Sequence, residues 1–180
     1  MRWFWIDRFQ EFESGRRAVA VKNVSLAEEH LHDHFPGAPV MPNALIIEGL
    51  AQTGGLLVAE HGGFNERVVL AKIAKACFHF PATPGDTLVY RVSIDDIHKD
   101  GAIVSGTSHV ESPLSGPVES RLQGEVQIFF AHLNESAAGQ SLFDPASLLA
   151  MLKLLGVFQV GRDAGGRPLE VPAALAAANH

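Results

Sequence analysis

The sequence predicts an α+β domain in which an antiparallel sheet curls around one central helix. Two observations lead to this class. Residues 44–60 are apolar nearly all round, which is typical of a helix that is buried on every side. Four segments rich in Val, Ile, Phe and Thr follow it, at 68–80, 86–98, 102–111 and 119–132, separated only by short turns. Connections this short cannot contain crossover helices, so the strands must be mostly antiparallel.

The residues before the central helix predict a strand and a rigid loop. Residues 16–24 alternate enough between polar and apolar side chains to indicate a strand. The polar segment 25–33 predicts a turn of helix at most, and a loop with three prolines follows at 36–42. We expect the central helix to be capped by Asn43, because the side chain of asparagine accepts a backbone N–H that has no helical partner.

We expect residues 1–137 to form one domain and residues 138–180 to be a C-terminal extension of it. Asp144-Pro145 predicts an N-cap followed by proline at the first helical position, and leucines then form an apolar stripe that Gly156 ends. We expect this helix, at about 144–155, to dock on its own subunit or on a neighbour. The glycine- and alanine-rich residues that follow it predict a flexible tail.

The composition argues against several classes of partner and site. A formal charge of −6 gives no basic footprint for nucleic acid. Cys77 is the only cysteine, which excludes an internal disulfide and a multi-thiolate metal site and is typical of a reducing compartment. The first residues lack a signal-peptide pattern, and the longest apolar stretch, 44–59, is short and interrupted by polar residues. We therefore expect a cytoplasmic protein without a membrane span.

Residues 34–48 give the strongest functional signal. They read His-Phe-Pro-Gly-Ala-Pro-Val-Met-Pro-Asn-Ala-Leu-Ile-Ile-Glu. The segment begins with a proton-transfer residue, passes through a rigid loop and enters an apolar helix that contains one carboxylate. An imidazole titrates near neutral pH, and a poorly solvated carboxyl group retains its proton. His34 and Glu48 are therefore a candidate base and a candidate acid for an apolar substrate.

A metal site is not expected, although His30, His32 and His34 lie close together around Asp33. The proline after Phe35 prevents the helix that would align His30 with His34, and no glutamate with the HExxH spacing is present.

The motif resembles that of the β-hydroxyacyl-acyl carrier protein dehydratases of type II fatty acid synthesis. The resemblance rests on His-Phe-Pro-Gly-x-Pro-Val-Met-Pro followed by Ile-Ile-Glu-x-Leu-Ala-Gln. It extends to Trp5-Ile6-Asp7-Arg8 and to Pro84-Gly85-Asp86, covers roughly residues 2–132 and leaves out the C-terminal segment. It implies the hotdog fold, a sheet wrapped around one long helix, which agrees with the pattern described above.

The resemblance also implies a reaction and a site. The catalytic pair of the family falls on His34 and Glu48, and glutamate at the second position points to the branch that only dehydrates. The implied reaction converts a (3R)-hydroxyacyl thioester of acyl carrier protein or coenzyme A to the trans-2-enoyl thioester without a cofactor. The implied assembly is a homodimer or a trimer of dimers, in which each site combines the histidine of one subunit with the acid of the other. Around this pair we expect these substrate-binding residues: Phe35, Gly37, Pro42, Asn43 and Gln52.

Three positions depart from the family pattern. Asp33 replaces the usual glycine before the histidine, and Ala38 stands where many members have arginine. Asn43 replaces a glycine whose backbone N–H polarises the thioester carbonyl in this family. Asparagine still offers that N–H group, but its side chain could narrow the site.

Two other functions stay open at this point. A hotdog thioesterase would hydrolyse the same kind of substrate with a carboxylate that activates water. A non-catalytic acyl-binding protein is conceivable because of the three departures and the additional C-terminal helix. Recognition of an acidic carrier protein would need basic residues near the site, and the strands offer four: Lys72, Lys75, Arg91 and Arg121.

Overall fold

The computed structural model describes residues 4–111, 119–133 and 144–176. The strands are β1 (Arg8–Glu13), β2 (Arg17–Asn23), β3 (Arg67–Phe78), β4 (Thr87–His98), β5 (Gly101–Glu111), β6 (Ser120–Leu133) and β7 (Gly161–Arg162). The helices are α1 (His30–Asp33), α2 (Asn43–His61), α3 (Pro145–Leu154), α4 (Val157–Val160) and α5 (Ala173–Ala176). Each predicted strand is present, with ends within about two residues of the prediction.

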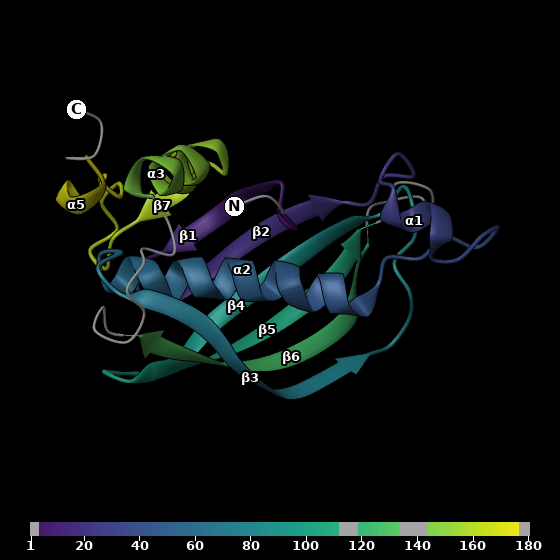
Figure 1. Cartoon of the computed structure of the whole chain (residues 1–180), viewed down its shortest axis with the longest axis horizontal. Coiled ribbons are helices and arrows are strands. Elements are labelled where there is room, and N and C mark those ends of the chain that lie inside the picture. The colour runs from purple at the N-terminus through teal and green to yellow at the C-terminus, as the bar shows by residue number, and fades with distance from the viewer. Residues whose placement is uncertain (1–3, 112–118, 134–143, 177–180) are drawn as a thin grey trace.

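The strands form one sheet in the order β3-β6-β5-β4-β2-β1-β7, which wraps around α2 (Figure 1). Every neighbouring pair is antiparallel except β1 and β7. The predicted α+β class, with a sheet around a central helix, is confirmed. Strand β1 was not predicted, because a register shift after Phe9 lets Phe9 and Phe12 both be buried and breaks the alternation of a regular strand.

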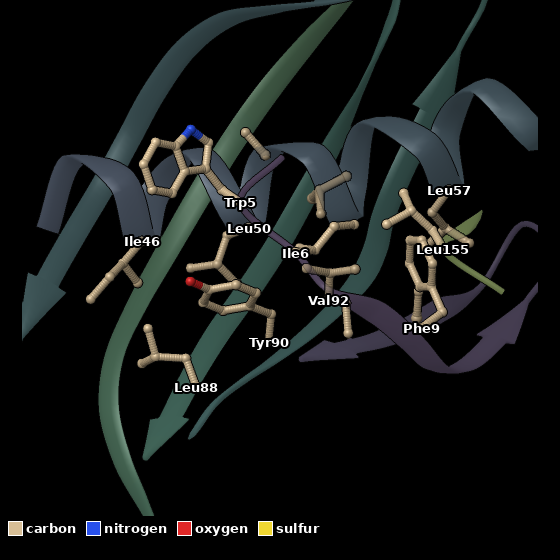
Figure 2. Close-up of a cluster of buried hydrophobic side chains, with 14 of the residues drawn as sticks. Trp5, Ile6, Phe9, Ile46, Leu50, Leu57, Leu88, Tyr90, Val92 and Leu155 are labelled. Carbon is tan, nitrogen blue, oxygen red and sulfur yellow. The ribbon is translucent and has the colours of Figure 1, made fainter. Parts of the chain in front are cut away.

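The core lies between α2 and the inner face of the sheet. Figure 2 shows Ile46, Leu50 and Leu57 of α2 among side chains from the neighbouring strands, and all three are fully buried. Gly49 permits this close approach, because a Cβ atom at that position would lie 2.4 Å from the ring of Tyr90. The helix is therefore fixed against the sheet by a position that tolerates no side chain.

Helix α2 is not buried on every side within one chain. A stripe along one face is exposed or half-buried, and it comprises Ala44, Glu48, Gln52, Gly55 and Ala59. The prediction of burial all round is therefore wrong for the single chain. The apolar composition indicated that the helix would be covered, but it did not say whether the cover would come from the same chain.

The C-terminal segment packs on the same core. The carboxylate of Asp144 caps α3 by accepting a hydrogen bond from the Ser147 N–H at 2.9 Å, and Gly156 after the helix has a φ of 77°, as expected for a helix end. In the segment predicted as a flexible tail, β7 pairs with β1 and Leu175 is buried. The predicted boundary at residues 137 and 138 and the last residues, 177–180, lie outside the described residues.

Within the described ranges, no helix is long and apolar enough to cross a membrane. The same residues contain no group of three or more His, Cys, Asp and Glu side chains arranged to hold a metal ion.

Glu60, near the end of α2, is buried, and its Oε2 atom has no hydrogen-bond partner among the described residues. Burial raises the pKa of Glu60, while a hydrogen bond from Ser14 and the charge of His61 act in the opposite direction. Between the ordinary glutamate pKa and this raised pKa, the folded state binds more protons than the unfolded state. The free energy of unfolding should therefore fall as the pH rises through that window.

Glutamine does not titrate, so the variant Glu60→Gln is expected to lack this fall in the free energy of unfolding with rising pH. The variant should be more stable than the wild type at pH values above the raised pKa of Glu60. Urea unfolding at a series of pH values measures the effect. Equal pH dependence of the two proteins would contradict the prediction.

Candidate active site

The loop before α2 begins with a tight turn. The N–H of Ala38 donates to the carbonyl oxygen of Phe35 at 3.0 Å, with Pro36 and Gly37 between them. Gly37 has a φ of 80°, the left-handed value that a type II turn requires after its proline. The Pro-Gly pair therefore shapes the chain immediately after His34.

Two further hydrogen bonds hold this loop in place. The N–H of Val40 donates to the carbonyl oxygen of His34 at 2.9 Å, and the N–H of Met41 donates to the carbonyl oxygen of Ala82 at 2.8 Å. The second bond ties the loop to the connection between β3 and β4. The backbone of His34 is thus fixed from both sides of the turn, which is what a preorganised acid–base group needs.

His34 is half-buried and lines a cavity of about 290 Å³, called here the His34 cavity. Its other lining residues come from the loop, from the start of α2 and from the end of β3: Val40, Met41, Asn43, Phe78, His79, Phe80 and Pro81. Among the described residues, no carboxylate lines this cavity. The sequence gave no signal that His79 belongs to this cavity, because it does not reveal that the end of β3 returns to the loop.

The β3 wall of the His34 cavity is anchored by a buried glutamine that the sequence did not single out. The Nε2 of Gln123 donates to the carbonyl oxygen of Phe80 at 2.9 Å, and the carbonyl oxygen of Gln123 accepts from the N–H of His79 at 2.8 Å. Gln123 is fully buried on β6. The first bond comes from the side chain of Gln123 and the second uses its backbone, so β6 holds residues 79 and 80 through both.

Helix α2 begins one residue earlier than predicted. Pro42 is the N-cap and Asn43 is the first helical residue, whose side chain makes no capping bond. The first bonds to the carbonyl oxygen of Pro42 come from the N–H groups of Leu45 and Ile46. The N–H groups of Asn43 and Ala44 therefore have no acceptor within the helix, and they point out of its positive end beside His34.

Glu48 lies on the open face of α2, where Gln52 orients it. The Nε2 of Gln52 donates to Oε1 of Glu48 at 2.9 Å, and the Oε1 of Gln52 accepts from the N–H of Trp5 at 2.9 Å. One carboxylate oxygen is thus held through Gln52 by the N-terminal segment. Glu48 is exposed in the single chain, so the expectation of a poorly solvated carboxyl group is not met there.

Glu48 and Gln52 line a second cavity, of about 330 Å³, called here the Glu48 cavity. Its walls are α2, residues 64–68, strands β3 and β6, and the helices of the C-terminal segment. No histidine lines it among the described residues. The structure therefore brings His34 together with Asn43, and Glu48 together with Gln52, but it does not bring His34 to Glu48 within one chain.

The other predicted site residues shape the loop without lining either cavity. Phe35 is 57% exposed and stacks on the ring of His34, with ring centroids 4.2 Å apart. Gly37 is exposed at the turn, and Pro42 is half-buried at the helix start. Their positions beside His34 agree with a role in holding the loop.

One of the four basic residues proposed for carrier recognition borders the His34 cavity. The guanidinium of Arg121 lies 4.3 Å from the ring centroid of Phe80, which lines that cavity. Lys75 instead pairs with Glu125 at 3.5 Å, and Lys72 lies over the ring of Phe129.

Comparison with known proteins gives a consistent result. Residues 3–111 match the family model of the FabA-like domain. The 3-hydroxyacyl-[acyl-carrier-protein] dehydratase FabZ of Thermomicrobium roseum is 39% identical over 134 residues, which are 74% of this chain and 85% of that protein. The protein of the same name from Herpetosiphon aurantiacus is 43% identical over 95 residues, 52% of this chain and 67% of that protein.

Among solved structures, an acyl-CoA hydrolase from Bacillus cereus superposes with a TM-score of 0.55 at 17% identity. The superposition covers 70% of this chain and 72% of that one. At this identity the likeness concerns the fold alone, and it supports the predicted hotdog arrangement of a sheet around a central helix.

Proposed function

The chain belongs to the FabA-like family, and on that premise we propose that it is a 3-hydroxyacyl-[acyl carrier protein] dehydratase of fatty acid synthesis. The reaction removes water from a (3R)-hydroxyacyl thioester and leaves the trans-2-enoyl thioester. The observation that carries the proposal is the motif at residues 34–48. In this motif an imidazole lies beside N–H groups of a helix start that have no acceptor within the helix, and a carboxyl group follows further along the same helix.

In the proposed reaction the imidazole of His34 removes the proton from C2 of the substrate. The carboxyl group of Glu48 donates its proton to the C3 hydroxyl, the C3–O bond breaks, and water leaves. A proton then returns from the imidazolium to the carboxylate before the next turnover. Because Gln52 already donates to Oε1 of Glu48, we assign the transferred proton to Oε2.

Negative charge develops on the thioester oxygen as the C2 proton leaves. The N–H groups of Asn43 and Ala44 are the proposed donors to this oxygen, because neither is used within the helix and the helix dipole favours an anion at this end. Asparagine at position 43 supplies the same backbone donor as the family's glycine.

We propose that the active unit is a homodimer, because each cavity of one chain contains only half of the catalytic pair. The His34 cavity has no carboxylate and the Glu48 cavity has no histidine among the described residues. The exposed stripe of α2 that contains Glu48 needs a cover, and the loop of a second copy would supply both the cover and the imidazole. A trimer of such dimers rests on the resemblance alone.

Strand β3 supports a dimer with two-fold symmetry. It is the edge of the sheet in the described structure, and Leu70 and Ile73 on it are each 41% exposed. A long edge strand with exposed apolar side chains is a template for pairing with another strand. Pairing of β3 with β3 of a second copy would be self-complementary, as a two-fold axis requires.

The proposed substrate carrier is acyl carrier protein, in agreement with the names of the relatives. Arg121 beside the His34 cavity is the proposed contact for an acidic carrier, because it is the one of the four candidate basic residues that borders this cavity. A cytoplasmic location is proposed on the single cysteine of the chain.

A product assay tests the function. The purified chain is incubated with a (3R)-hydroxyacyl carrier protein, and the products are followed by the absorbance of the conjugated thioester and by mass spectrometry of the carrier. We expect loss of water with the thioester intact. Release of free carrier thiol without enoyl product would identify a thioesterase, and binding without turnover would identify an acyl-binding protein; either result overturns the proposal.

A further inference from the structure

The C-terminal segment lies outside the residues that match the family, 3–111, but it is part of the folded unit. The carbonyl oxygen of Leu155 accepts from the N–H of Phe9 at 2.8 Å, and Leu149 and Leu152 are buried in the common core. Figure 1 shows α3 near the C-terminal end of α2, the end opposite to α1 and the His34 loop. The family comparison assigns no role to this segment.

The same segment forms one wall of the Glu48 cavity. The side chains that it contributes are apolar: Pro145, Leu148, Met151, Leu155 and Leu175. Helix α2 forms another wall, and its lining side chains change in character along the helix, from the polar pair Glu48 and Gln52 to Gly55, Leu56 and Ala59. The cavity is therefore polar at Glu48 and Gln52, and it is apolar between the rest of α2 and the C-terminal segment. Polar side chains from the connection between α2 and β3 complete its lining: Asn65, Glu66 and Arg67.

We infer that α3 and α5 close the far end of the Glu48 cavity and set the length of the acyl chain that the enzyme accepts. This inference rests on the function proposed above. The occupant is the acyl chain of the substrate, because its reacting end must reach Glu48 and its tail then has the apolar part of the same cavity before it. The C-terminal segment is thus a specificity element added to the family's domain.

The dimensions of the cavity give an expected length. From Glu48 to Ala59 the helix advances about 16 Å, at about 1.5 Å per residue. An extended chain with C–C bonds of about 1.5 Å advances about 1.25 Å per carbon, so this distance accommodates about thirteen carbons. Each buried methylene should raise kcat/KM by about fourfold, until the chain meets Leu148 and Met151.

The test measures kcat/KM for dehydration of hydroxyacyl carrier proteins with chains of about four to about sixteen carbons. Leu148→Trp adds bulk to the cavity wall, and Met151→Ala removes it. The matched control is Leu154→Trp, because Leu154 lies on the same helix, is 71% exposed and does not line the cavity. Thermal unfolding of each variant shows whether it is folded.

For Leu148→Trp we expect about 10–100-fold lower kcat/KM on the longest chains accepted by the wild type, and a change of less than about twofold on the shortest, because only long chains lose buried methylenes. Met151→Ala should shift the preference toward longer chains, and Leu154→Trp should keep the wild-type profile. If the wild type dehydrates but the profiles of both cavity variants coincide with it, or fall equally at every length, the inference is wrong. A wild type without dehydratase activity at any length would instead overturn the proposed function.

Discussion

Replacement of Glu48 by glutamine is expected to lower kcat for dehydration by about 10²–10⁴-fold, and His34→Ala should have an effect of the same order. Glutamine has nearly the shape of glutamate and retains the side-chain carbonyl oxygen that accepts from Gln52. The variant therefore keeps the local geometry and loses only the proton that the departing hydroxyl group needs. Steady-state kinetics with a hydroxyacyl carrier protein measure the loss.

Two variants control for the loss of a charge or a ring elsewhere. Glu11→Gln removes a half-buried carboxylate that pairs with Arg17 on the neighbouring strand, and His98→Ala removes an exposed imidazole on β4. Neither residue lines either cavity. These controls should stay within about threefold of the wild type, as is usual for surface substitutions. A Glu48→Gln variant with activity in the same range would refute its role as the acid.

A mixture of the two inactive variants is expected to regain activity that neither has alone. If each site combines His34 of one subunit with Glu48 of the other, a dimer of one His34→Ala chain and one Glu48→Gln chain contains one intact site and one site with both changes. Random assortment makes about half of the dimers mixed, so about a quarter of the wild-type activity should return. This is a gain of more than tenfold over either variant.

The experiment needs exchange of subunits, which co-expression of the two chains with different affinity tags provides. Tandem purification isolates the mixed dimer, for which we expect about half of the wild-type activity per dimer. The control is a chain that contains both changes, co-expressed with the wild type. This mixed dimer also has one altered histidine and one altered acid, but each falls in a different site. Neither site is then intact, so the control dimer should be inactive. A mixed dimer of the single variants that stays as inactive as its parents would exclude a site shared between subunits.

The fold could be predicted because its signals are local. The apolar segment at 44–60, the four strand segments and the short turns between them each depend on neighbouring residues, and the structure has the corresponding elements. Helix α3 was equally predictable, because Asp144, Pro145 and Gly156 mark its ends. Strand β1 was missed since its register shift removes the regular alternation that indicates a strand.

The candidate site was predictable only in part. The motif identified His34 and Glu48 because their residue types and spacing lie within one short stretch. It did not identify Phe78 and His79, which line the His34 cavity, or Gln123, which holds that wall from β6. These residues lie far from the motif in the sequence and have no periodicity that relates them to it.

The sequence by itself determined the central helix, most of the strands, the family motif and the chemical character of the proposed acid and base, since these depend on residue types at short separation. Only the tertiary structure decided that His34 and Glu48 line separate cavities of one chain, that one face of α2 is open, and that the C-terminal segment forms a wall of the Glu48 cavity. The physical reason is that burial and cavity walls arise from contacts between distant segments. A pattern of apolar residues shows that a surface will be covered but not which part of the molecule will cover it.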